Sequence, residues 1–169
     1  MKKIILIVLT TILSYSVEVN DTLPTTVIPG KHGGTVEHKA WNSDSLKGKV
    51  HTILYMDPDK REATQGLLDA LGGLKLSSNR YTTVAIINLA ATWLPNSIIQ
   101  SKLKSKQKDL KNMEYIFDKD RYLVKKWNLK DNDSNVIITN SKNRVVYQKS
   151  GNFTQKDIKQ IISIIKNTK

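Results

Sequence analysis

Four aspartates in two short segments are the residues of this chain best suited to do chemistry. Asp57 and Asp59 follow an apolar run with a two-residue spacing, and Asp131 and Asp133 repeat that spacing further along the chain. If the two segments meet, paired carboxylates can hold a hard cation or support carboxylate-assisted or metal-assisted hydrolysis. The glycine and the closing glutamate of a calcium-binding loop are absent. A helix cap and a polar turn are therefore the simpler interpretation of the two segments.

Other catalytic chemistries lack the residues they need. The chain contains no cysteine, which excludes thiol catalysis, disulfide exchange and thiolate metal sites. Its three histidines, His32, His38 and His51, lie in unrelated segments, so no shared metal site is expected. No serine stands in a nucleophile-elbow motif. We therefore predict no enzymatic activity and no cofactor.

The chain is strongly basic, with a net charge of +12 over 169 residues, a length that suits one domain. Only four of the 27 basic residues are arginine, the residue that nucleic-acid readers favour. The densest lysines, between Lys102 and Lys111, alternate with polar residues, which favours a solvated helix face over a nucleic-acid patch. Trp41, Trp93 and Trp127 could form a binding face, but core or sheet-edge positions are favoured for each.

Residues 1–16 have the three parts of a secretory signal peptide. Lys2 and Lys3 precede an apolar run over residues 4–13, and small residues follow at Ser14 and Ser16. The apolar run is too short to span a bilayer as a helix, and no cysteine follows it for lipid attachment. We expect cleavage after Ser16, export, a periplasmic location and no stable membrane anchor.

The mature chain is predicted to alternate strands and helices after an irregular lead-in at residues 17–33. Apolar and β-branched runs predict strands at residues 50–56, 81–89, 113–117, 135–139 and 145–148. Periodicity and capping residues predict helices at residues 60–71, 95–111, 119–127 and 155–166. Residues 34–169 are thus expected to form one α/β domain.

This order of elements predicts a central mixed β-sheet flanked by helices on both faces. Strand–helix–strand crossovers imply parallel neighbours, and the short connection at residues 140–143 implies an antiparallel hairpin. We expect the helices that begin near Lys60, Pro95 and Gln155 to cover the two faces between them. The order is that of the thioredoxin fold, with the extra β-α unit seen in periplasmic redoxins.

Residues 45–50 (SLKGKV), and the series of residues 115–118, Trp127 and residues 136–147, resemble segments of thioredoxin-like exported proteins. Residues 35–45 with Trp41-Asn42-Ser43, Gly48-Lys49-Val50, residues 79–88 and Trp127-Asn128-Leu129 are similar to a narrower group. On these segments the chain resembles the YtfJ-like family of small periplasmic proteins over about residues 34–167. The resemblance implies a thioredoxin-like fold, export to the periplasm and no established activity. Some descriptions of the family use the label transcriptional regulator, against which the signal peptide argues.

The predicted function depends on two segments in which this chain differs from other thioredoxin-like proteins. The loop that holds Cys-x-x-Cys in thioredoxins reads DPDKRE at residues 57–62, and the segment that carries their cis-proline reads DNDSN at residues 131–135. We therefore predict a non-catalytic module that binds an unknown periplasmic protein or peptide at the carboxyl ends of the strands. The candidate binding residues are Asp57, Asp59, Lys60, Arg61, Asp131, Asp133 and Ser134. Hydrolysis by the four aspartates, and nucleic-acid binding by the helix with Lys102–Lys111, remain as alternatives.

Overall fold

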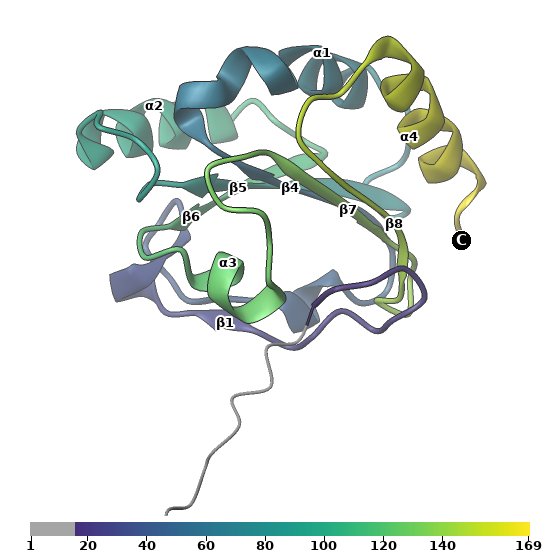
Figure 1. Cartoon of the computed structure of the whole chain (residues 1–169), viewed down its shortest axis with the longest axis horizontal. Coiled ribbons are helices and arrows are strands. Elements are labelled where there is room, and N and C mark those ends of the chain that lie inside the picture. Colours follow the sequence, from purple (N-terminus) through teal and green to yellow (C-terminus); the bar gives the residue numbers. More distant parts are fainter. Residues whose placement is uncertain (1–15) are drawn as a thin grey trace, which may run out of the picture.

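A six-stranded mixed sheet forms the centre of the molecule (Figure 1). The computed structural model describes residues 16–169, so the predicted signal peptide, apart from Ser16, lies outside the described residues. The sheet has the order β2-β6-β5-β4-β7-β8. Its strands are β2 (Gly33–Thr35), β4 (Val50–Met56), β5 (Tyr81–Asn88), β6 (Met113–Asp118), β7 (Asn135–Thr139) and β8 (Val145–Ser150). The helices are α1 (Arg61–Gly72), α2 (Asn96–Gln107), α3 (Tyr122–Trp127) and α4 (Gln155–Asn167).

The pairing of the strands confirms the predicted mixed sheet. Strand β4 runs parallel to β5, and β5 runs parallel to β6. Strand β7 is antiparallel to both β4 and β8, as the predicted hairpin requires. Every residue of β4 and β7 is buried, because both faces of these central strands are covered. That double coverage explains why their sequences are continuous apolar runs rather than alternating patterns.

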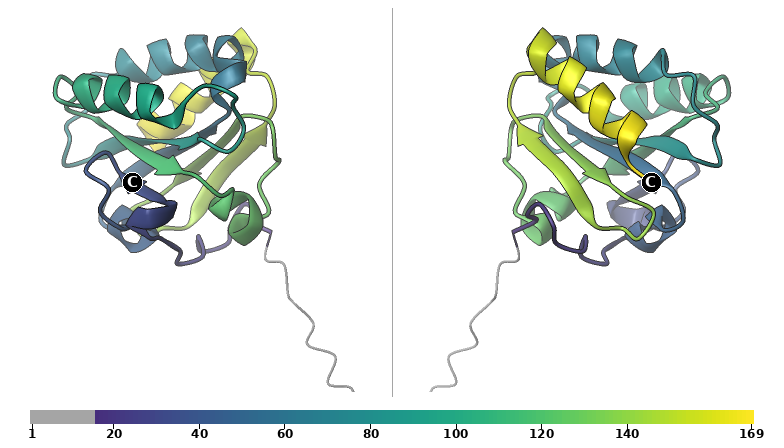
Figure 2. Two further views of the ribbon diagram at one scale, coloured as in Figure 1. Left: turned by 90° about the vertical axis from the view of Figure 1, so that its left-hand side faces the viewer. Right: turned by 90° about the vertical axis from the view of Figure 1, so that its right-hand side faces the viewer.

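The three long helices share one face of the sheet, so the expectation that they divide between the two faces is wrong. Figure 2 shows α1, α2 and α4 on the same side, where Leu67, Leu103 and Ile161 pack over one core cluster. The crossovers β4-α1-β5 and β5-α2-β6 step across the sheet in the same direction. Since right-handed crossovers in one direction place their helices on one side, α1 and α2 must be neighbours.

The opposite face is covered by α3 together with the lead-in and two short strands, β1 (Val27–Ile28) and β3 (Trp41–Asn42). Trp127 of α3 is fully buried, and its ring meets that of Trp41 edge-on with centroids 6.3 Å apart. Its indole N–H donates to Thr26 Oγ1 at 2.9 Å. The lead-in is therefore attached to α3 by hydrogen bonds, and β3 is attached to α3 by a large aromatic contact.

Two of the helices are shorter than predicted because side chains bond the backbone at their ends. The amide of Gln107 accepts from the N–H of Tyr115 at 2.7 Å and donates to the carbonyl of Met113 at 2.8 Å, so α2 ends there and β6 begins. Asp118 accepts from the N–H of Tyr122 at 2.8 Å and thereby sets the start of α3. No helix within residues 16–169 has the length and apolar character needed to cross a membrane.

The buried His51 of β4 makes stability depend on pH. Its Nδ1–H donates to the carbonyl of Lys49 at 3.1 Å, and burial, with Lys49 nearby, lowers the pKa of its imidazole to about 4. An unfolded histidine takes up a proton near pH 6.5, so folding stability is complete above that pH and is lost as pH falls towards 4. At about 1.4 kcal/mol per pH unit, the wild type loses roughly 2–3 kcal/mol between pH 7.5 and 4.5 through this residue.

The His51→Asn variant provides the reference for this prediction. Its amide nitrogen takes the place of Nδ1 and can donate to the Lys49 carbonyl, but it cannot titrate. Urea unfolding of both proteins at pH 7.5 and 4.5 measures the difference, in which the contributions of other titrating groups cancel. An equal loss of stability in the two proteins would contradict the assignment to His51.

Candidate functional site

Loops that follow β4, β5 and β6, and the loop that precedes β7, meet at one end of the sheet. We call this region, made of residues 57–61, 89–95, 119–121 and 131–134, the carboxyl-end surface. The N–H of Leu89 donates to the carbonyl of Asp118 at 2.8 Å, and Arg121 Nη2 donates to the carbonyl of Ala90 at 3.1 Å. Tyr55, near the end of β4, pairs with the first residue of β7. The two predicted aspartate segments therefore lie at the same end of the sheet.

Asp57 and Asp59 organise the loop that leads into α1. Asp57 is buried, and its Oδ1 accepts from the N–H of Asp59 at 2.9 Å, which fixes a turn of 3-10 helix over Pro58–Lys60. Asp59 is exposed and accepts from the hydroxyl of Thr92 at 2.5 Å, which ties this loop to the one after β5. The Asp57-Pro58-Asp59 segment thus has the predicted capping role in the structure.

Asp131, Asp133 and Ser134 lie beside that loop, and each carboxylate has its own basic partner. Arg121 Nε lies 3.2 Å from Asp131 Oδ1, and Lys130 Nζ lies 2.9 Å from Asp133 Oδ2. Partial burial opposes ionisation of Asp133, but Lys130, the Ser134 N–H and Lys60 together hold its pKa below the usual value. Ser134 is 1% exposed. The two loops are close in space, because Tyr55, just before the first loop, pairs with Asn135, just after the second.

The predicted binding residues thus differ in their exposure to solvent. Asp57 and Ser134 are buried below the surface, whereas Asp59, Lys60 and Arg61 are exposed. The four aspartates are held by local partners rather than turned towards a common point. Within residues 16–169, no three histidine or acidic side chains gather as metal ligands.

The three histidines occupy three separate places. His32 pairs with Asp120 and lies 6.3 Å from the ring of Tyr122, measured between centroids. His38 occupies a turn after β2 with φ of 60°, and His51 is buried within β4.

A buried polar group beneath the surface was missed by the sequence analysis. The carboxylate of Asp118 is fully buried and accepts from the hydroxyl of Tyr55 at 3.1 Å and from the N–H of Leu123 at 2.9 Å. Burial, and then the charge of Asp118, raise the pKa of Tyr55. An aspartate that ends an apolar strand just before a short helix is the local signal for a cap, but nothing local indicates Tyr55 as a partner.

Trp93 is the second residue that sequence reasoning misjudged. Trp41 and Trp127 are buried as expected, but the prediction of a core or edge position is wrong for Trp93, which is 84% exposed. It lies in the loop after β5, beside Leu94 and close in sequence to Ile98, which is 60% exposed. The loop is held by the Thr92–Asp59 hydrogen bond and by the N–H of Leu94, which donates to Thr92 Oγ1 at 3.2 Å.

Together, the sheet order, the crossovers and the terminal hairpin and helix define a thioredoxin-like domain, here without the cysteines that give such domains their redox chemistry. A solved structure of the pneumococcal exposed lipoprotein thioredoxin from Streptococcus pneumoniae supports this class: the TM-score is 0.58 at 15% identity, over 85% of this chain and 98% of that one. The chain belongs to a family described as bacterial protein of unknown function (YtfJ_HI0045), whose model matches residues 25–168.

Two curated relatives match along most of their length. The uncharacterized protein YtfJ of Escherichia coli (strain K12) is 27% identical over 132 residues, which cover 76% of this chain and 71% of the relative. An uncharacterized protein of Haemophilus influenzae is 22% identical over 128 residues, or 74% and 70% of the two chains. The predicted resemblance to the YtfJ-like family and the predicted thioredoxin-like fold are confirmed.

Proposed function

We propose that this chain is an exported binding module that recognises a periplasmic protein or peptide at its carboxyl-end surface and catalyses no reaction. The exposure of Trp93 carries the proposal. Tryptophan buries more apolar area than other side chains and is enriched at the centres of protein interfaces. A loop that is held by hydrogen bonds and presents this ring to solvent, beside Leu94 and Ile98, has the character of an interaction site.

The charges next to Trp93 indicate the chemistry of the partner. Lys60 and Arg61 are exposed at the start of α1, where free N–H groups and the positive end of the helix dipole already favour negative groups. The aspartates nearby are engaged by Arg121, Lys130 and backbone N–H groups. An acidic or carbonyl-presenting segment of the partner, with an apolar residue to cover Trp93, fits this surface.

Site-specific crosslinking in living cells tests the proposal. An aromatic photo-crosslinking residue, which keeps a large apolar ring at the position, replaces Trp93 and, as a control on the opposite face, Val27, which is 42% exposed. We expect one or a few discrete protein adducts from position 93 and none of these from position 27. N-terminal sequencing of the recovered adduct is expected to begin at Val17, as export with cleavage after Ser16 requires.

Charge reversal shows whether the basic residues take part. Lys60→Glu with Arg61→Glu is expected to lower the yield of the adducts at least fivefold, because an acidic partner would be repelled. The matched control is Lys125→Glu with Lys126→Glu, an equal charge change at exposed positions of α3. Equal yields from both double variants, or the same adducts from positions 93 and 27, would contradict the proposed surface.

A further inference from the structure

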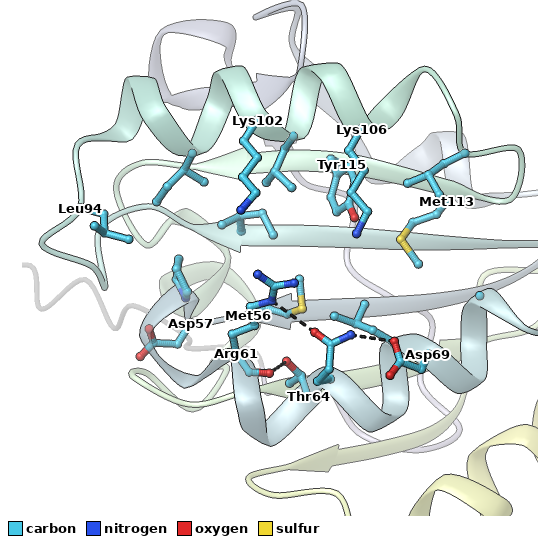
Figure 3. Close-up of a pocket in the computed structure, with 18 of the residues that line it drawn as sticks. Met56, Asp57, Arg61, Thr64, Asp69, Leu94, Lys102, Lys106, Met113 and Tyr115 are labelled. Atoms are coloured by element: carbon cyan, nitrogen blue, oxygen red, sulfur yellow. Dashed lines mark hydrogen bonds between the residues drawn. The ribbon is translucent and has the colours of Figure 1, made fainter.

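An apolar groove lies between α1 and α2 and borders the carboxyl-end surface, with which it shares residues such as Asp57, Arg61 and Leu94. Its volume is about 570 Å³, within the range of cavities that bind small ligands. Met56, Ile87 and Tyr115 of three adjacent strands form its floor, and Leu68 and Leu103 form parts of its two walls. Figure 3 shows α1 on one side of the groove and α2 on the other.

The groove exists because α2 does not pack closely against the rest of the molecule. No residue of α2 is fully buried, although the helix carries Ile98, Ile99 and Leu103. Ile98 is exposed and Ile99 and Leu103 are half-buried, whereas the floor residues are buried. The apolar surface that stays in contact with solvent therefore lies mainly on α2, and a ligand with an apolar part gains free energy by covering it.

Three cationic side chains border this apolar floor. Lys102 and Lys106 extend from α2 over the groove, and Arg61 faces them from the start of α1 (Figure 3). The two lysines are four residues apart, so their ammonium groups share one face of the helix and repel each other. None of the ion pairs within residues 16–169 includes these three side chains. An anion placed between them would relieve this repulsion.

Two acidic residues, Asp57 and Asp69, also line the groove, but the three cations outnumber them. Asp57 accepts from the N–H of Asp59, and Asp69 accepts from Gln65 Nε2 at 2.7 Å. Gln65 in turn accepts from Arg61 Nε at 3.2 Å, and the terminal nitrogens of that guanidinium form no hydrogen bond with the described residues. The groove therefore combines an apolar floor with positive charge at its rim.

From this combination we infer that the α1–α2 groove binds a single-chain anionic amphiphile. The acyl chain lies on the floor formed by Met56, Ile87 and Tyr115, and the carboxylate or phosphate head group lies between Lys102, Lys106 and Arg61. A nucleic acid would not use the aliphatic floor, and an uncharged apolar molecule would not use the three cations. This binding activity goes beyond the proposed recognition of a protein at the carboxyl-end surface and does not depend on it.

Calorimetric titration of the mature chain with four simple probes tests the inference. The probes are dodecanoate, dodecyl phosphate, dodecan-1-ol and octanoate, each kept as monomers in solution. We expect the two dodecyl anions to bind, dodecan-1-ol to bind at least tenfold more weakly, and octanoate to bind roughly 250-fold more weakly than dodecanoate, at about fourfold for each of the four missing methylenes. The comparison between the two anions distinguishes a carboxylate ligand from a phosphate ligand.

A matched pair of double variants tests where the head group binds. Lys102→Glu with Lys106→Glu removes the cations that border the groove, and Lys104→Glu with Lys108→Glu makes the same charge change at exposed positions outside its lining. We expect at least tenfold weaker dodecanoate binding in the first and less than twofold in the second. Circular dichroism and urea unfolding establish that both variants fold.

Three results would overturn the inference. Dodecan-1-ol that binds as tightly as dodecanoate would remove the role of the anionic head. Equal weakening in both double variants would indicate attraction to the overall charge of the helix rather than a site. Binding to anionic phospholipid vesicles without binding of monomeric dodecanoate would indicate a membrane surface as the partner of α2.

Discussion

Replacing Asp118 with leucine is expected to lower the free energy of unfolding by about 3–5 kcal/mol. The carboxylate is fully buried and accepts four hydrogen bonds, from the Tyr55 hydroxyl and from the N–H groups of Asp120, Tyr122 and Leu123. Leucine fills a similar space but accepts none of them, so buried donors lose their partner and α3 loses its cap. Urea unfolding followed by circular dichroism measures the change.

Asp120→Leu is the matched control for this prediction. Asp120 stands two residues later and pairs with His32, but its side chain is half exposed. Removal of an exposed ion pair should cost less than about 1 kcal/mol. A second comparison uses Tyr55→Phe, which should destabilise the wild type more than the Asp118→Leu protein, because the hydroxyl has already lost its acceptor there. Equal costs for the two aspartates would show that the buried network does not determine stability at this end.

The strands could be predicted because burial on both faces produces a continuous apolar run within the sequence of each strand. The continuous apolar runs at residues 50–56 and 135–139 correspond to strands buried on both faces, and their bounds are as predicted. The faces on which the helices lie could not be derived in this way. They depend on the order of β4, β5 and β6 across the sheet, which is a property of the tertiary fold rather than of any one segment.

The candidate site, like the fold, could be predicted only where the signal lies within one segment of the sequence. The Asp-Pro-Asp segment contains its own hydrogen-bond acceptor for the turn, so a local pattern identifies the cap at Asp57. Asp118 bonds the hydroxyl of Tyr55, 63 residues away, and no local pattern contains that partner. The exposure of Trp93 is equally non-local. The loop sequence is compatible with either a buried or an exposed ring, and only the position of the loop relative to α1 and α2 decides between them.

The three tryptophans allow stability and recognition to be separated. Trp127→Ala is expected to lower the free energy of unfolding by about 3–5 kcal/mol, because it leaves a large cavity beside Trp41 and removes the hydrogen bond to Thr26. For a chain of this size, that corresponds to a fall of roughly 10 °C in Tm. The lead-in, whose Val17 N–H donates to the carbonyl of Trp127, should also become more sensitive to proteases.

Trp93→Ala is the counterpart with the opposite expectation. Its ring is 84% exposed, so truncation should change the free energy of unfolding by less than about 0.5 kcal/mol. If the ring contacts a partner, the same variant should weaken that contact strongly, since exposed tryptophans in interfaces often supply much of the binding energy. Calorimetric unfolding of both alanine variants measures the first difference, and the yield of a photo-crosslinked adduct from a probe at the exposed Glu62 measures the second. A Trp93→Ala protein that is as unstable as Trp127→Ala would place the ring in the core and remove the main support for a binding surface at this end of the sheet.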